Sequence, residues 1–202
     1  MHTIIMDAQK SSRDIILGRI RASHPSEVAH PEVPMYGIEG DPVDNFIRHL
    51  ESFDGKAMRF ASRSEALGWL EKNIDRTGKR VYSSASDYEG NIADSEVADP
   101  HNAHIVDVCV GEGVIGVGET GSVYVTDESL GLAACALFST DLYLLLDCSK
   151  IVDGMHTAYR MIDLRANRYG SFFTGPSATA DIEAVRVTGA QGEISLTTLI
   201  FG

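Results

Sequence analysis

The carboxylate of Glu119 lies in a glycine-bounded turn, Gly118-Glu119-Thr120-Gly121, between two short apolar segments. In an open α/β sheet, ligands bind beyond the ends of the strands, where such turns occur. A glutamate on an apolar rim has a raised pKa and can serve as an acid, a base or a nucleophile. We therefore predict Glu119 as a catalytic acid or base, with Thr120 and Gly121 among the ligand-binding residues. The alternative is a solvated turn carboxylate that only satisfies backbone amides.

A second segment, residues 174–183, combines a Gly-Pro turn with hydroxyl and acidic side chains, and a helix is expected at 178–187. Hydroxyl groups at a helix start stand where backbone N–H groups lack partners, which favours the binding of an anion. Acidic residues in a first turn stabilise the helix but repel an anion unless they point away. Asp181 is a second catalytic candidate, and the alternative for the whole segment is simple helix capping. The predicted ligand-binding residues here are Thr174, Gly175, Pro176, Ser177, Thr179 and Glu183.

Two further patterns indicate other chemistry less specifically. His101 and His104 have side chains suited to zinc or iron, but one short segment does not supply a full set of ligands. Gly111–Gly116 fits G-x-G-x-x-G, yet a strand follows it in place of the helix that would hold a pyrophosphate. We therefore predict that this chain binds no metal and no cofactor, and that these glycines lie at bends of a curved sheet.

Alternating helical and strand patterns must position these residues. Helices are predicted where apolar residues recur at helical spacing behind capping residues, and strands where apolar runs are short. The alternation predicts an α/β fold with a Rossmann-like parallel sheet and helices on both faces. The expected helices are 42–53, 63–73, 128–138, 153–165 and 178–187, and the expected strands are 57–60, 79–82, 105–110, 114–117, 123–125, 142–146, 171–174 and 194–201.

The first 40 residues are expected to lie outside this fold. A helix is predicted at 11–21, and the closely spaced Pro25, Pro31 and Pro34 then favour an extended arm. Residues 41–202 are predicted to form one domain, whose first helix begins with Asp41 as its N-cap and a proline in its first turn.

Composition limits the classes of function. The chain has 202 residues with 17 Lys and Arg against 29 Asp and Glu, so its formal charge is −12. Such acidity counts against a nucleic-acid partner and against an anionic membrane surface. The 3 cysteines are not clustered, which indicates reduced thiols and no iron–sulfur site in this chain. No stretch is apolar over the ~20 residues of a membrane span, and no leader pattern begins the sequence, so the predicted location is the cytoplasm.

The segment from Thr174 to Glu183 resembles the G-P-S-x-T-A-D-I-E signature of the lactate-utilization (LUD) domain family, which includes lactate utilization protein C. Gly118–Ser122 resembles the A-E-T-G-T stretch of that family, and residues 189–200 resemble its closing turn and strand. The family usually has His-Gly-Pro before this strand, where the present chain has Gln191-Gly192-Glu193. The chain also lacks the arginine and the Leu-Pro pair that follow the E-T-G turn in the family.

The resemblance implies a Rossmann-like fold of the NagB/RpiA/CoA-transferase-like type, shared by phosphosugar isomerases and CoA transferases. It implies a subunit that binds a small anionic metabolite and supports the oxidation of L-lactate to pyruvate with iron–sulfur partner proteins. CoA transferases of that fold carry a catalytic glutamate in a Glu-x-Gly turn, which Glu119-Thr120-Gly121 matches. One alternative is a stand-alone isomerase- or transferase-type enzyme or sensor for a phosphorylated or CoA-linked metabolite, and another is a non-catalytic scaffold.

Overall fold

Five strands rich in Val, Leu and Ile form a parallel sheet in the larger unit of the computed structural model, Met35–Gly202. The structure describes residues 11–26, 28–181 and 183–202, and the chain divides into this unit and Met1–Pro34. Because Leu144, Leu145 and Leu146 in the middle of the sheet are all fully buried, both of its faces must be covered. Its strands, in spatial order, are β1 (Lys56–Phe60), β11 (Ser195–Phe201), β6 (Asp141–Asp147), β3 (Val108–Glu112) and β2 (Val81–Ser83).

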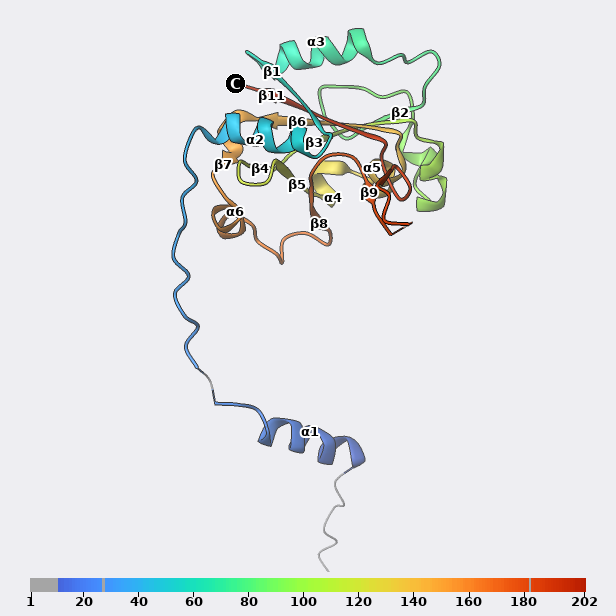
Figure 1. Cartoon of the computed structure of the whole chain (residues 1–202). Helices are drawn as coiled ribbons and strands as arrows, with labels where there is room; N and C mark the ends of the chain where they lie inside the picture. The colour runs from blue at the N-terminus through green and yellow to red at the C-terminus, as the bar shows by residue number, and fades with distance from the viewer. Residues whose placement is uncertain (1–10, 27, 182) are drawn as a thin grey trace, which may run out of the picture. The chain divides into compact units, whose positions relative to one another are not determined.

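Helices cover both faces of this parallel sheet (Figure 1). On one face, α3 (Arg63–Asn73) buries Ala66 and Leu70 against Leu145 and Leu199. On the other face lie α2 (Pro42–Ser52), α4 (Asp127–Leu130) and α5 (Ala133–Phe138). The structure is therefore a Rossmann-like α/β fold, which confirms the fold class predicted from the sequence.

A second, four-stranded sheet packs beneath the first. Its spatial order is β7 (Ile151–Val152), β4 (Ile115–Val117), β5 (Ser122–Thr126) and β8 (Gly170–Phe173), with β5 antiparallel to both of its neighbours. The inner side chains of this sheet, such as Val123 and Phe173, join the main core, and α6 (Met155–Met161) packs on its other face. The sequence indicated most of these strands but not that they form a separate sheet.

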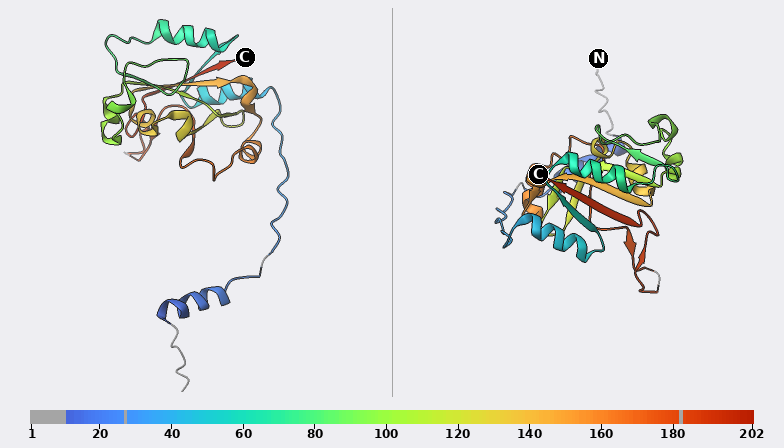
Figure 2. Two further views of the ribbon diagram at one scale, coloured as in Figure 1. Left: turned by 180° about the vertical axis from the view of Figure 1, so that it is seen from behind. Right: turned by 90° about the horizontal axis from the view of Figure 1, so that it is seen from above.

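The segment after β8 is a β-ribbon, and the prediction of a helix at 178–187 was wrong. β9 (Ala178–Thr179) and β10 (Val187–Thr188) pair antiparallel, with Thr179 opposite Val187. Glu183 has a φ of 55° and Ala184 has a φ of 57°, so the chain turns through left-handed residues between the two strands. The ribbon projects beyond the end at which β11 begins (Figure 2, right).

The other expected elements are present with shifted boundaries. The helix expected at 128–138 is broken at Gly131, whose φ of 65° ends α4 and whose missing Cβ leaves room for the Tyr82 hydroxyl. The helix expected at 153–165 ends at Met161. Short 3-10 helices appear at η1 (Asp94–Glu96), η2 (Pro100–Ile105) and η3 (Cys148–Lys150). Because η2 extends to Ile105, the strand expected at 105–110 begins only at residue 108, as β3.

The smaller unit contains α1 (Ser12–Ala22), close to the range predicted for the first helix. Ser11 caps this helix, because its hydroxyl accepts a hydrogen bond from the backbone N–H of Asp14. None of its residues is buried, and Ile15, Ile16 and Ile20 are exposed.

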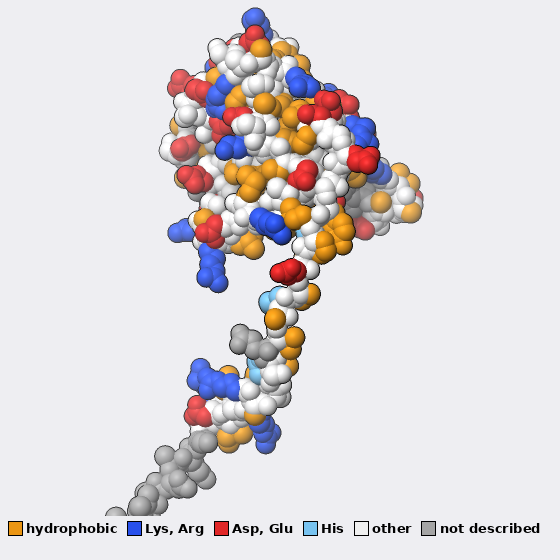
Figure 3. Space-filling view, turned by 90° about the vertical axis from the view of Figure 1, so that its left-hand side faces the viewer, with side chains coloured by type: hydrophobic (Ala, Val, Ile, Leu, Met, Phe, Trp, Pro, Cys, Tyr) orange, Lys and Arg blue, Asp and Glu red, His pale blue; other side chains and the backbone are white. Residues whose placement is uncertain are grey.

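No helix in the described part of the chain is both long and apolar enough to span a membrane. On the face seen in Figure 3, acidic and basic side chains of the larger unit are interspersed with apolar ones, and no continuous basic surface forms there.

Candidate functional site

A cavity of about 270 Å³ lies between the end of β8, the loop that follows it and the residues that precede β11. We call it the signature cavity. It is found where β6 and β11 begin, since Ile194 N donates to Thr140 O across the two strand starts, at 2.9 Å. Its lining contains no Lys, Arg or His side chain. The lining residues are Leu137, Tyr169, Ser171, Phe172, Phe173, Thr174, Gly175, Pro176, Ser177, Gln191 and Glu193.

Two glycines fix the two predicted site segments against one helix, α2. Gly121 has a φ of 66°, and a Cβ there would overlap the backbone of His49 and Leu50. Gly175 has a φ of 67°, and a Cβ there would overlap the carbonyl oxygen of Phe53, just beyond the end of α2. Only glycine combines this backbone conformation with such a close approach, so both segments depend on α2 for their position.

A chain of hydroxyl groups joins the E-T-G turn to the cavity. Thr120 Oγ1 lies 2.7 Å from Ser122 Oγ, and Ser122 Oγ in turn shares a hydrogen bond with Thr174 Oγ1. Ser122 is buried, while Thr174 lines the cavity. The structure thus brings Thr120 and Thr174 together through Ser122, a residue that the sequence did not single out as part of a site.

The loop from Thr174 to Ser177 supplies the cavity with four of the predicted ligand-binding residues. It is held by the main chain, because Ser177 N donates to Glu193 O at 3.0 Å and Gly189 N donates to Ser177 O at 2.7 Å. The hydroxyl groups of Thr174 and Ser177 can therefore be presented to a ligand from a fixed backbone. The short strand β9 follows this loop in place of the expected helix, so the predicted role of a helix N-terminus in holding an anion no longer applies.

Glu119 does not line the signature cavity. Its side chain is exposed, and Oε2 accepts a hydrogen bond of 2.9 Å from Met155 N in the first turn of α6. The backbone N–H of Glu119 donates to Asp153 O at 2.8 Å, which holds the turn beside that helix start. Its carboxylate therefore occupies the place of a cap on α6, although it comes from a distant part of the sequence.

Replacing the carboxylate of Glu119 tests this capping arrangement. Glu119→Gln keeps an acceptor oxygen but removes the negative charge at the helix N-terminus, so we expect a loss of about 0.5 kcal/mol in the free energy of unfolding. Glu119→Ala removes the acceptor as well and should cost about 1 kcal/mol. Urea unfolding measures both losses. A variant with native stability and reduced ligand binding would contradict the cap and favour the predicted catalytic role.

The remaining predicted residues of the signature lie in the β-ribbon and not around the cavity. Thr179 Oγ1 donates to the Asp181 carboxylate at 2.9 Å, and Asp181 N donates back to Thr179 Oγ1 at 3.3 Å. Glu183 is exposed at the turn. Arg186 pairs with Asp54 at 2.8 Å, which joins the ribbon to the end of α2.

Glu193 is the acidic residue of the cavity, and the sequence did not single it out. It is only 5% exposed, and among the described residues its carboxyl accepts a hydrogen bond only from its own backbone N–H. Burial raises the pKa of this carboxyl above its ordinary value. The one available signal was the departure from His-Gly-Pro at Gln191-Gly192-Glu193, which puts an acid directly before a buried strand.

His101 and His104 belong to η2, at the amino-terminal side of β3. His101 Nδ1 lies 2.8 Å from Asp99 Oδ1, and His104 Nδ1 lies 2.6 Å from His101 O. Over residues 11–26, 28–181 and 183–202, no group of three or more His, Cys, Asp and Glu side chains is arranged to hold a metal ion.

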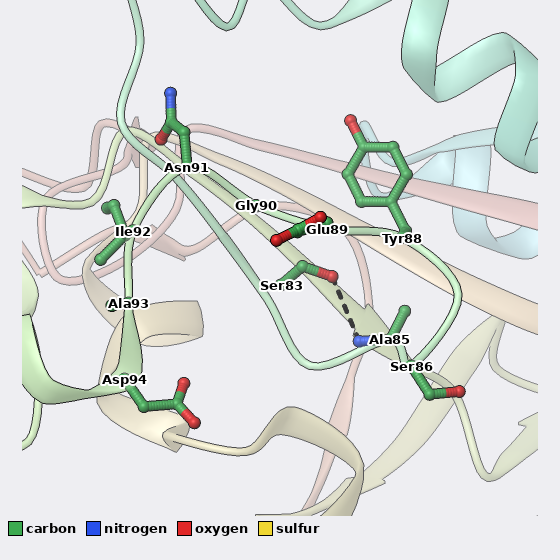
Figure 4. A pocket seen from close by; sticks show the side chains of 10 residues that line it. All are labelled: Ser83, Ala85, Ser86, Tyr88, Glu89, Gly90, Asn91, Ile92, Ala93 and Asp94. Carbon is green, nitrogen blue, oxygen red and sulfur yellow. Dashed lines mark hydrogen bonds between the residues drawn. The ribbon is translucent and has the colours of Figure 1, made fainter.

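A larger cavity of about 600 Å³ lies in the loop after β2 (Figure 4). Two of its lining side chains are bonded to the main chain: Ser83 Oγ accepts from Ala85 N at 3.2 Å, and the Asn91 side chain bonds Val81 N and the carbonyls of Arg76 and Lys79. In Figure 4 the Tyr88 ring points away from Asp94 and Ala93. These bonds therefore fix the shape of the loop around the cavity.

The carboxyl ends of the parallel strands carry an ion cluster. The Arg63 guanidinium donates to both oxygens of Asp87, at 2.7 Å each, and also to the Glu112 carboxylate at the end of β3. Both carboxylates hold the pKa of Arg63 above its ordinary value. Since the guanidinium is already occupied by two carboxylates, this cluster stabilises the sheet edge and offers no free cation to an anion.

Comparisons with known proteins agree with this fold. A crystal structure of a DUF162 family protein from Deinococcus radiodurans matches with a TM-score of 0.62 and 13% sequence identity, over 80% of this chain and 96% of that chain. At this identity the likeness shows the fold alone. No curated protein matches the sequence. A family model for the LUD domain matches residues 93–201, which include the E-T-G turn, the T-G-P-S loop and Glu193. Because the match spans more than half of the 202 residues, the chain belongs to the LUD-domain family.

Proposed function

We propose that this LUD-domain protein is a subunit of a lactate-utilization system and that it holds a small carboxylate, L-lactate or pyruvate, in the signature cavity. The family implies involvement in lactate utilization. The observation that carries the proposal is that the T-G-P-S loop lines a cavity of about 270 Å³. That volume suits a small metabolite.

The lining of the cavity suits a ligand with both oxygen and carbon surfaces. The Thr174 and Ser177 hydroxyls and the Gln191 amide can donate hydrogen bonds to a carboxylate or a carbonyl. Phe173 and Leu137 provide apolar contacts for a methyl group. Such a combination of a few polar groups in an apolar lining is typical of sites for small molecules.

The oxidation itself belongs, in this proposal, to an assembly. Lactate loses two electrons and two protons on becoming pyruvate, so an electron acceptor is required. The cysteines of this chain do not cluster, since Cys109 and Cys135 are buried free thiols and Cys148 is a separate one. Iron–sulfur partner proteins would supply the acceptor, and the present chain would position the substrate.

Binding measurements on the purified chain test the proposal. We expect lactate and pyruvate to raise the midpoint of thermal unfolding, because a ligand that binds only the folded state stabilises it. Ser177→Ala and Thr174→Val should each weaken lactate binding by roughly tenfold, the usual effect of losing a hydrogen bond to a charged group. Thr188→Val, in the β-ribbon outside the cavity, is the matched control and should bind normally.

Reconstitution distinguishes a subunit from a stand-alone enzyme. The chain alone should show little oxidation of lactate and should gain it with iron–sulfur partner proteins. Sugar phosphates and acyl-CoAs in the same thermal panel test the isomerase- or transferase-type alternative. If these compounds stabilise the protein while lactate and pyruvate do not, the alternative replaces the proposal.

A further inference from the structure

The side chain of Glu193 is buried in a cavity whose lining contains no cation. Its side chain lines the cavity, and the residue is 5% exposed. No Lys, Arg or His shares the lining, and among the described residues the carboxyl accepts a hydrogen bond only from the backbone N–H of Glu193 itself. An acid in this position is therefore available to a ligand.

The charged groups of the surrounding elements have partners of their own or lie outside the lining. Asp141, at the start of β6, pairs with Lys79 at 2.7 Å and accepts a hydrogen bond from Ser195. Arg186 of the β-ribbon pairs with Asp54, and Asp181 is bonded to Thr179. α5, β8 and the loop at 174–177 contain no Asp, Glu, Lys, Arg or His. The charges that face Glu193 are thus few, and its state depends on what enters the cavity.

Placing a carboxylate ligand beside an ionised Glu193 in this cavity would make the free energy of binding unfavourable. Two negative charges within a few ångströms repel each other, and one of a pair of adjacent carboxylates takes up a proton as a result. A protonated carboxyl is also a hydrogen-bond donor, while an ionised one can only accept. Burial raises the pKa of Glu193 above its ordinary value, because desolvation disfavours the charged form.

We propose that the signature cavity binds its small carboxylate ligand together with one proton, which Glu193 holds and donates as a hydrogen bond to the ligand. This inference rests on the proposed function, since it takes the ligand to be a carboxylate. No bond other than this hydrogen bond forms, and the proton comes from solvent. The proton shared between Glu193 and the ligand then takes the role that a Lys or Arg side chain has in many anion-binding sites.

The proposal fixes the sign of the pH dependence. Above the pKa of Glu193 in the free protein, each binding event takes up one proton, so the dissociation constant for lactate should rise about tenfold per pH unit. Below that pKa the proton is already present and the affinity should level off. Lactamide, a neutral amide of the same shape, needs no proton on Glu193 and should show no such slope.

Isothermal titration calorimetry of lactate tests this between about pH 5 and about pH 8. We expect Glu193→Gln to remove the pH slope, because its amide is neutral and donates a hydrogen bond at every pH in this range. At about pH 8, in two buffers with different ionisation heats, the native chain should take up about one proton per lactate and Glu193→Gln should take up none. Glu128→Gln, an exposed change in α4, should behave as the native chain does.

The results of these titrations distinguish a failure of this inference from a failure of the proposed function. Lactate binding with the same pH slope in Glu193→Gln, or with no proton uptake in the native chain, overturns this inference and leaves the proposed function standing. An affinity that rises with pH overturns it as well, since an ionised Glu193 would then be the acceptor. If neither lactate nor pyruvate binds the native chain or Glu193→Gln at any pH, the proposed function fails and this inference fails with it.

Discussion

Gly121→Ala is expected to lower the free energy of unfolding by about 3 kcal/mol, the sum of a left-handed alanine and an overpacked contact. Its Cβ would meet the backbone of His49 and Leu50, which cannot move aside as a side chain could. Gly175→Ala meets the carbonyl of Phe53 in the same way and should cost a similar amount. Chemical denaturation of each variant measures the loss.

Gly68→Ala is the matched control. Gly68 lies within α3, and a Cβ there would meet no atom within 4 Å. The helix should gain about 1 kcal/mol, because alanine is the better helix former. If Gly121→Ala and Gly175→Ala were as stable as the native chain, the close packing of the two signature turns on α2 would be contradicted.

Arg63→Met should cost about 2 kcal/mol, between the values for exposed and buried ion pairs. The change leaves the carboxylates of Asp87 and Glu112 without the guanidinium that joins them. It also removes the contact of Arg63 with the ring of Phe201, whose centre lies 5.4 Å from the guanidinium carbon. Arg59→Met is the control, because the Arg59–Asp44 pair is 61% and 71% exposed and should contribute no more than about 0.5 kcal/mol.

The cost of Arg63→Met should also depend on pH. The hydrogen bond from Arg63 is the main cause of the lowered pKa of Asp87. A carboxyl whose pKa is lower in the folded state contributes stability above its unfolded pKa and loses it as the pH falls through the folded value. The difference between the native chain and the variant should therefore shrink below about pH 4. A difference that stays constant down to about pH 2 would contradict this role of Arg63.

The parallel sheet could be predicted from the sequence because burial on both faces leaves a local pattern. The run from Leu142 to Leu146 is continuously apolar, as a central strand must be. The start of α2 was equally visible, since Asp41 and Pro42 are capping residues whose effect is local. By contrast, Gly131 breaks the expected helix at 128–138 because the Tyr82 hydroxyl occupies the space of its Cβ, a contact between distant residues.

In the β-ribbon and the site too, local features could be predicted from the sequence and contacts between distant residues could not. The residues of 178–183 are compatible with a helix locally, but Arg186 is held by Asp54 and Ser177 by the main chain at Gly189 and Glu193. The T-G-P-S loop could be identified from its residue types. The hydrogen bond from Met155 N to Glu119 and the burial of Glu193 could not be predicted. Both depend on residues that are distant in the sequence and come together only in the folded structure.

The order of strands in the central sheet also affects how the protein is made. β11 lies between β1 and β6 although it follows every other strand in the chain. During synthesis on the ribosome, β1 therefore has no neighbour in the sheet until residues 195–201 have emerged. A premature stop just before β11 would consequently leave β1 unpaired and the side of β6 that β11 normally covers exposed, and both unpaired strand edges would be open to aggregation.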